Sequence, residues 1–208
     1  MVNQFNQAHK ESDHFLKSQT LIDLVQKALT LVKFESDKIE VLEVGCGQGL
    51  NLANFNFSQL LGIDISEEAI YKARQNFNNF EFQCLSSLKL DQIERSFDLI
   101  LDAHQIHYLQ SKDEISQYIR NVFKRLNSGG VFCFEAMVKS KEMLLTDLSV
   151  TVLDYLEYEK IVTEAGFRII YLMLPNGRKI IADKKRRAAL SSDPDVLLVI
   201  ATKEDVAN

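Results

Sequence analysis

The chain has 208 residues and a formal net charge of −5 at neutral pH, with 46% hydrophobic and 25% charged residues. This length suits one domain with a single core, and the balance of apolar and charged residues excludes extensive disorder. The acidic balance gives no general attraction to nucleic acid, and no stretch approaches the 18 apolar residues of a membrane span. Because residues 1–10 lack the apolar core of a signal peptide, we expect one cytoplasmic domain over residues 1–208.

Three widely spaced cysteines, Cys46, Cys84 and Cys133, form no C-x-x-C pair and have no histidine at metal-ligand spacing. Each falls in or beside a predicted strand, where cysteine behaves as a small hydrophobic residue. We therefore expect reduced, buried thiols and no metal site.

The N-terminal segment predicts a helix after an aromatic-rich lead-in. Apolar residues recur at three- and four-residue steps between Phe15 and Phe34, which is typical of one face of a helix. Phe5, His9 and His14 precede this helix. The lead-in is either a cover over a ligand or a frayed terminus beside an ordinary helix.

Residues 39–44 predict a buried strand that runs into a glycine loop and a short helix at 49–55. Gly45, Gly47 and Gly49 stand at every second position, and such a loop exposes backbone N–H groups at a helix start. The third glycine comes one residue too early for a dinucleotide fingerprint. Glu43 would repel a pyrophosphate and favour a cationic group such as an ammonium or sulfonium.

The second predicted strand, residues 60–64, ends in Asp64, which lies 19 residues after Gly45. An acid at this distance from a glycine loop is placed to bind both hydroxyls of a ribose. Ser66 is an expected helix N-cap with acids behind it, and it predicts a helix to about residue 77.

The rest of the chain continues the alternation and then changes rhythm. Strands are expected at 80–85, 97–102 and 131–136, with a helix at 111–126 and a turn at 127–130. A helix at 154–165 and strands at 167–174 and 196–202 follow, the last two without a helix between them. This order predicts an α/β fold, a doubly wound and mostly parallel seven-stranded sheet with an antiparallel edge strand.

The pattern Glu43-x-Gly45-x-Gly47-x-Gly49, followed by Gly62-Ile63-Asp64, resembles the class I S-adenosylmethionine-dependent methyltransferases. The resemblance covers most of the chain and implies S-adenosylmethionine as cofactor, with residues 1–34 as a lid. It also implies a set of cofactor-binding residues: Glu43, Gly45, Gly47 and Gly49 for the methionine part, with Cys46 between them, Asp64 for the ribose, Ile65 against the adenine, Ser86 and Ser87 near the adenine amino group, and Asp102 beside the cofactor.

One position departs from the family pattern. Ser86 stands where many members have an acid that accepts a hydrogen bond from the adenine amino group, and a serine accepts that bond more weakly. This departure keeps open a second reading, a non-catalytic protein that binds an adenosyl ligand or a partner. A nicotinamide oxidoreductase is a further rival, which the glycine spacing and Glu43 disfavour.

The chemistry is predicted at the tip of the strand at 97–102. His104 is expected to face the substrate and is our candidate catalytic residue, because histidine takes up protons near neutral pH. For His107 we favour a structural role.

A small molecule accepting the methyl group on O, N or S is the simplest substrate. The strand at 97–102 is not followed by the Asn/Asp-Pro-Pro-Tyr/Phe motif of adenine or glutamine methyltransferases, nor by the Pro-Cys of cytosine C5 enzymes. RNA is the second candidate, because the long loop at 175–195 carries six basic residues and one acid between residues 178 and 187. A solvated loop without a ligand is the plainer reading of that segment.

Overall fold

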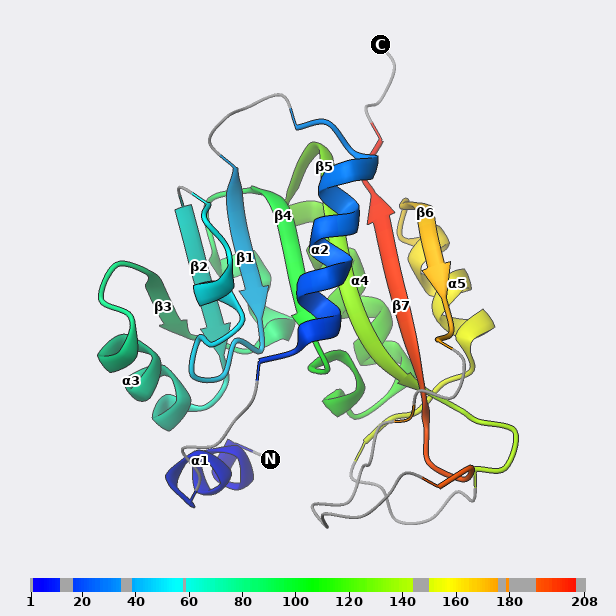
Figure 1. The fold of residues 1–208 in the computed structure, drawn as a ribbon, viewed down its shortest axis with the longest axis horizontal. Helices are drawn as coiled ribbons and strands as arrows, with labels where there is room; N and C mark the ends of the chain where they lie inside the picture. Colours follow the sequence, from blue (N-terminus) through cyan, green and yellow to red (C-terminus); the bar gives the residue numbers. More distant parts are fainter. Residues whose placement is uncertain are drawn as a thin grey trace.

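The computed structural model describes residues 2–11, 17–34, 39–57, 59–143, 150–175, 179 and 190–204. Within these residues seven strands form one sheet in the order β3-β2-β1-β4-β5-β7-β6 (Figure 1). They are β1 (Glu40–Val44), β2 (Gln59–Asp64), β3 (Glu81–Cys84), β4 (Phe97–Ala103), β5 (Leu126–Val138), β6 (Arg168–Met173) and β7 (Asp195–Thr202). β7 runs antiparallel to both neighbours, and the other pairs are parallel. The predicted seven-stranded, mostly parallel sheet is confirmed, with the antiparallel strand one place in from the edge.

Helices cover both faces of this sheet, as a doubly wound fold requires. α2 (Gln19–Leu31) and α3 (Glu67–Asn76) pack on one face, and α4 (Lys112–Arg125) and α5 (Tyr155–Glu164) pack on the other. Short 3-10 helices complete the connections: η1 (Leu52–Asn54), η2 (Ser87–Gln92) and η3 (Ile106–Tyr108). The apolar side chains of the sheet accordingly divide into two buried clusters, one beneath each helix layer.

The helix starts follow the capping residues that the sequence contains. The hydroxyls of Ser66 and Ser111 each accept a hydrogen bond from the N–H three residues further on. Asp154 and Glu157 form a reciprocal capping box at the start of α5. The strand register then aligns the ends of three strands, because Val44 of β1 pairs with Ile63 of β2 and Asp102 of β4.

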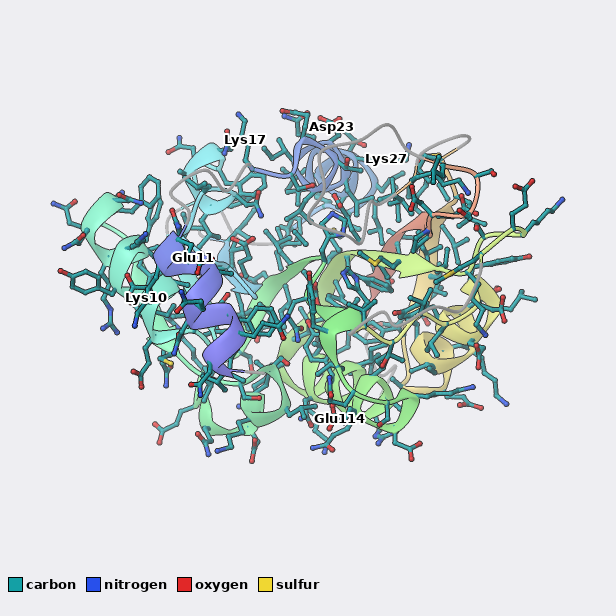
Figure 2. The ribbon with its side chains drawn as sticks, turned by 90° about the horizontal axis from the view of Figure 1, so that it is seen from below. Lys10, Glu11, Lys17, Asp23, Lys27 and Glu114 are labelled. Atoms are coloured by element: carbon teal, nitrogen blue, oxygen red, sulfur yellow. The ribbon has the colours of Figure 1, made fainter. Side chains whose placement is uncertain are left out.

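The N-terminal lead-in forms a helix, α1 (Val2–Glu11), that lies across one end of the sheet. Figure 1 shows it beyond the ends toward which β1 and β2 point, and Figure 2 shows it from below, in front of the sheet. Asn6 Oδ1 accepts a hydrogen bond from the Ser66 hydroxyl at 2.7 Å, and Lys72 Nζ donates to the His9 carbonyl at 2.6 Å. Both contacts hold α1 against α3. The helix predicted from Phe15 begins at Gln19, and residues 12–16 lie outside the described residues.

The prediction of a turn at residues 127–130 is wrong. These residues form an irregular start of β5, where the register with β4 shifts between Phe97 and Leu99. The Gly129 N–H donates to the Lys203 carbonyl at 2.8 Å, and the Lys203 N–H donates to the Gly130 carbonyl at 2.9 Å. Backbone pairing with the chain beyond β7 therefore draws the two glycines into the sheet instead of leaving them as a turn.

Most of the predicted basic loop lies outside the described residues, including Arg178 and residues 184–187. Lys179 is described, and its Nζ lies 2.8 Å from Oδ1 of Asp195, so this charge is already paired. Of the three cysteines, Cys46 and Cys133 are buried as expected, whereas Cys84 is exposed because β3 is the outer strand. None of the helices in the described ranges is both long and apolar enough to cross a membrane.

Candidate functional site

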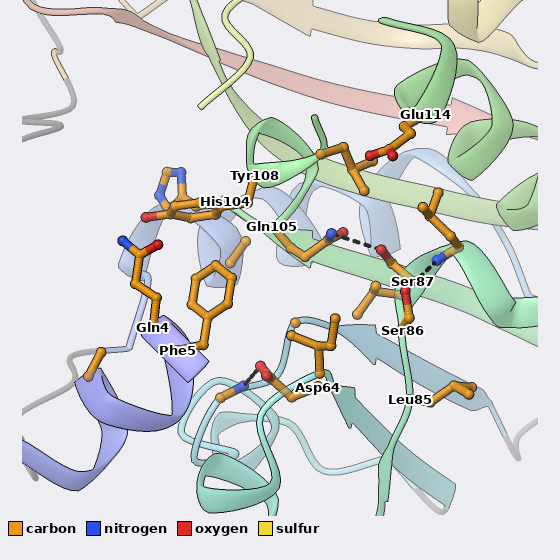
Figure 3. Close-up of a pocket in the computed structure, with 18 of the residues that line it drawn as sticks. Gln4, Phe5, Asp64, Leu85, Ser86, Ser87, His104, Gln105, Tyr108 and Glu114 are labelled. Carbon is orange, nitrogen blue, oxygen red and sulfur yellow. Dashed lines mark hydrogen bonds between the residues drawn. The ribbon is translucent and has the colours of Figure 1, made fainter. Parts of the chain in front are cut away.

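A cavity of about 480 Å³ opens at the carboxyl ends of β1, β2 and β4, where open α/β sheets bind their ligands (Figure 3). This volume lies within the usual range for small-molecule sites in proteins. Seven of the predicted site residues line it: Gly45, Gly47, Asp64, Ile65, Ser86, Ser87 and His104. The structure therefore brings together residues that the sequence separates by up to 59 positions.

Four other predicted residues, Glu43, Cys46, Gly49 and Asp102, do not line the cavity. Gly49 packs against Phe82, so that a Cβ added there would lie 2.8 Å from the ring. Cys46 is buried, and its thiol contacts the Gly47 carbonyl. The ligand-binding roles predicted for these four residues stay predictions. In the structure their contacts are with other parts of the protein and not with the cavity.

The glycine loop adopts a backbone that side chains disfavour, with φ of +73° at Gly45 and +53° at Gly47. The N–H groups of Gly45 and Cys46 both donate to the Ile63 carbonyl, which ties the loop to β2. A Cβ on Gly45 would lie 2.6 Å from Cβ of Gln105, so the bare backbone is required for the close approach of the β1 and β4 loops.

Asp64, at the end of β2, connects the glycine loop to the start of α3. Its Oδ2 accepts from the Gly47 N–H at 2.9 Å, and its Oδ1 accepts from the Ser66 N–H at 2.8 Å. Burial raises the pKa of this carboxyl, although these hydrogen bonds and the nearby His9 act in the opposite direction. The side chain reaches the cavity wall and keeps further lone pairs for a ligand.

Two fully buried acids lie behind the cavity. Oε1 of Glu43 accepts from the Asn51 amide at 2.6 Å, while Oε2 has no partner among the described residues. Burial raises the pKa of Glu43 to about 8, so this group is largely protonated at neutral pH. Asp102 accepts from the Tyr118 hydroxyl and from the N–H groups of Gln105 and Ile106 at the start of η3, and burial raises its pKa to about 7. Asp102 thus fixes the loop that carries His104.

Ser86 and Ser87 form the wall beyond β3. Ser86 Oγ accepts from the Leu88 N–H at 3.3 Å, and Ser87 Oγ accepts from the Gln105 amide at 2.9 Å (Figure 3). Gln105 was not predicted as a site residue. It spans the cavity floor from Gly45 to Ser87, so it links the β4 loop with the loop after β3.

His104 stands on the opposite wall, beside Tyr108 (Figure 3). Its Nε2 lies 2.7 Å from Oε2 of Glu135, a buried carboxyl group on β5. His107 is fully buried, and burial holds its pKa well below the ordinary value. This burial agrees with the structural role predicted for His107, and Tyr108 occupies the wall in its place.

Helix α1 roofs the cavity with Gln4, Phe5, Ala8 and His9, one face of the helix. The Phe5 ring meets the Tyr108 ring edge-on, with centroids 5.2 Å apart. The His9 ring lies over the glycine loop, 3.5 Å from the position of a Cβ on Gly47, and burial lowers its pKa. These residues recur at helical spacing, but only Phe5 and Ala8 are apolar, so the sequence gives a weak signal for this face.

The described residues contain no group of three or more histidine, cysteine, aspartate or glutamate side chains that could hold a metal ion. The cavity combines a backbone loop, the acids Asp64 and Glu114, two serines, and a roof of Gln4, Phe5, Ala8 and His9. This donor set suits an uncharged or cationic organic ligand with several hydroxyl or amino groups.

Sequence comparisons place these features among known proteins. A family model described as "Methyltransferase domain" matches residues 35–185. A malonyl-[acyl-carrier protein] O-methyltransferase of Bacillus anthracis is 33% identical over 105 residues, which are 48% of this chain and 38% of that protein. A second such enzyme, from Bacillus cereus, is 29% identical over 64% of this chain and 51% of its own length. The chain thus spans about half, or less, of the length of these relatives.

Solved structures with a similar fold cover nearly the whole chain. An S-adenosylmethionine-dependent methyltransferase from Clostridium acetobutylicum aligns with a TM-score of 0.69 at 15% identity, over 98% of this chain and 99% of that one. The N-methyltransferase NodS of Bradyrhizobium japonicum, in complex with S-adenosyl-L-homocysteine, aligns with a TM-score of 0.69 at 18% identity, over 97% and 99%. At these identities the likeness concerns the fold.

Proposed function

We propose that this chain, which belongs to the class I S-adenosylmethionine-dependent methyltransferases, transfers a methyl group to an oxygen, nitrogen or sulfur atom of a small molecule. The observation that carries the proposal is the cavity at the carboxyl ends of β1, β2 and β4, with the glycine loop and Asp64 in its wall. Its size suits a small acceptor beside a cofactor better than a polymer.

The residues present fit S-adenosylmethionine. Gly45 and Gly47 expose backbone at the loop where the methionine part would lie, and Asp64 offers carboxylate oxygens for ribose hydroxyls. Ile65 supplies an apolar surface for the adenine, and Ser86 and Ser87 supply hydroxyl groups at its edge. When bound, the cofactor supplies a methyl group that its sulfonium already activates.

The chain's own residues then have two tasks, to orient the acceptor and to exclude water. Phe5, Tyr108 and His104 enclose the space between α1 and the β4 loop, so they would hold the acceptor. His104 remains our candidate for receiving a proton from an acceptor that must lose one. Apolar and aromatic side chains from α1 limit the entry of water from above.

Turnover tests this proposal directly. Purified protein is incubated with S-adenosylmethionine and either the low-molecular-weight filtrate or the retained fraction of a cell extract, and S-adenosylhomocysteine is measured. We expect product with the filtrate and none without extract. Product only with the retained fraction would point to RNA or protein as acceptor. Binding of S-adenosylhomocysteine without product from either fraction would indicate a binding protein instead.

We also propose that α1 acts as a lid over the bound cofactor. Asn6 Oδ1 accepts from the Ser66 hydroxyl at 2.7 Å and, more weakly, from the Glu68 N–H at 3.4 Å, so Asn6→Ala removes the contacts by which this side chain holds the roof closed. We expect dissociation of S-adenosylhomocysteine to accelerate about fivefold, which corresponds to one hydrogen bond of about 1 kcal/mol. Stopped-flow competition measures this rate.

Asn3→Ala is the matched control, since Asn3 is an exposed asparagine on the same helix. Its dissociation rate should equal that of the unmodified protein. Equal rates for both variants would remove the lid role from α1.

A further inference from the structure

A chain of hydrogen bonds runs behind the cavity from the His104 ring to Glu43 at the end of β1. His104 Nε2 lies 2.7 Å from Glu135 Oε2, and the Ser18 hydroxyl donates to Glu135 Oε1 at 2.8 Å. The Ser18 N–H donates to Asn51 Oδ1 at 2.7 Å, and the Asn51 amide donates to Glu43 Oε1 at 2.6 Å. These contacts connect the β4 loop, β5, the start of α2 and the end of β1.

Glu135 is the central member of this chain. Its side chain is 1% exposed, and a carboxyl group buried to this degree requires hydrogen-bond donors. Its two oxygens have one side-chain donor each, the Ser18 hydroxyl and His104 Nε2. The proton of a neutral His104 ring therefore belongs on Nε2, which leaves Nδ1 unprotonated.

The rest of the His104 environment agrees with this assignment. Nδ1 is enclosed and has no partner among the described residues, which a nitrogen without a proton tolerates better than a buried N–H group. His104 also has φ of +69°, and no other non-glycine residue of the described ranges has a positive φ. Side chains rarely adopt this backbone, and such residues concentrate at functional sites.

We propose that Glu135 is a positioning residue that holds the His104 ring at the cavity wall in a single orientation with its proton on Nε2. Ser18, in turn, orients the Glu135 carboxyl group. The proposal rests on the function proposed above, because it concerns how the methyl-transfer site fixes the orientation of a histidine that lines its cavity. It assigns roles to two residues, Glu135 and Ser18, that do not line the cavity.

Nitrogen-15 NMR of the imidazole groups tests the assignment without knowledge of the acceptor. The His104 signal is identified by its loss in His104→Gln. In the unmodified protein we expect a downfield Nε2–H proton that exchanges slowly with water, together with an unprotonated Nδ1. Glu135→Gln should retain this proton signal, because the amide oxygen still accepts the hydrogen bond, and Glu135→Leu should abolish it.

Ser18→Ala provides a second variant that places no apolar side chain at Glu135. Ser18 also caps α2 by accepting from the Leu21 N–H at 3.2 Å, and Ser111 caps α4 by accepting from the Glu114 N–H at the same distance. Ser111→Ala is therefore the matched control for loss of a cap. Both variants should lower Tm by similar amounts, but only Ser18→Ala should increase the exchange rate of the His104 proton.

The outcomes separate this inference from the proposed function. A proton signal that survives unchanged in Glu135→Leu, or equal exchange in Ser18→Ala and Ser111→Ala, overturns the positioning role. If the unmodified protein fails to bind S-adenosylhomocysteine in calorimetry, the proposed function fails whatever the NMR result. With an active extract fraction, Glu135→Leu should lower kcat about tenfold at unchanged KM for S-adenosylmethionine, and Glu135→Gln should recover most of that loss.

Discussion

Asp64→Ala is expected to weaken the binding of S-adenosylhomocysteine more than a hundredfold. The Asp64 carboxyl group lies in the cavity wall and also accepts from the N–H groups of Gly47 and Ser66. Its removal deletes the predicted hydrogen bonds to the ribose and frees the glycine loop at once. Together these losses amount to about 3 kcal/mol, since hydrogen bonds to charged groups contribute about 1.5–3 kcal/mol each. Isothermal titration calorimetry measures the affinity.

Asp98→Ala is the matched control for this variant. Asp98 lies at the opposite end of the sheet, near the start of β4, and its oxygens accept from the Glu40 N–H at 2.9 Å and the Asn127 amide at 2.8 Å. The Asp98→Ala variant therefore loses a comparable number of structural hydrogen bonds, but its substitution lies away from the cavity. We expect it to lower Tm and keep the affinity. Unchanged affinity in Asp64→Ala would remove the ribose role from Asp64.

Glu43→Gln is expected to change how stability depends on pH. Burial raises the pKa of Glu43 from 4.5 to about 8, so the folded chain keeps a proton that the unfolded chain releases above pH 4.5. The free energy of unfolding therefore falls as pH rises from 4.5 to 8, by up to about 1.4 kcal/mol per pH unit from this group. Glutamine keeps the shape and cannot ionise. The free energy of unfolding of the variant, relative to that of the unmodified protein, should therefore rise by about 3 kcal/mol between pH 5 and pH 8.

Urea unfolding at pH 5, 6, 7 and 8 measures this difference. Asp102→Asn provides a comparison, because burial raises the pKa of Asp102 from 3.8 to about 7, so its contribution is lost over a lower window. The gain of Asp102→Asn should therefore level off near pH 7, whereas that of Glu43→Gln should continue to pH 8. A constant difference between Glu43→Gln and the unmodified protein at all four pH values would mean that Glu43 is ionised in the folded chain.

The sheet was predictable because its signals are local. Apolar runs that end at glycines or acids mark β1 and β2. Ser66 and Ser111 mark helix starts, and each hydroxyl accepts a hydrogen bond from the N–H three residues further on. The irregular start of β5 was not predictable from such signals. It depends on pairing with Lys203, which is far away in the sequence.

Helix α1 was missed as a helix for a similar reason. Its ten residues are mostly polar and carry no continuous apolar stripe, and a helix this short is marginal on its own. Contacts with α3, through Asn6 and the His9 carbonyl, stabilise it. The sequence alone therefore does not show that these residues cover the cavity, because their position depends on the contacts of α1 with α3 and with the end of β2.

Within the site, the prediction was good for residues at strand tips and poor for residues that reach across loops. Gly45, Gly47 and Asp64 line the cavity because the parallel register brings the ends of β1 and β2 together. Asp102 stands at such a tip as well, but its carboxyl group turns inward to Tyr118 and η3. The pairing of Ser18 with Glu135 spans 117 positions and leaves no pattern in the sequence.

Thermal unfolding with excess ligand tests the central claim most directly. The purified protein is melted with S-adenosylmethionine, S-adenosylhomocysteine or NAD in parallel, each at concentrations up to millimolar. At about a hundredfold excess over Kd, a ligand that binds only the folded chain adds about 2.7 kcal/mol, which raises Tm by roughly 5–10 °C for a domain of this size. We predict this shift with the two adenosyl ligands and none with NAD. A shift with NAD alone, or with none of the three, would contradict the assignment of the cavity to S-adenosylmethionine.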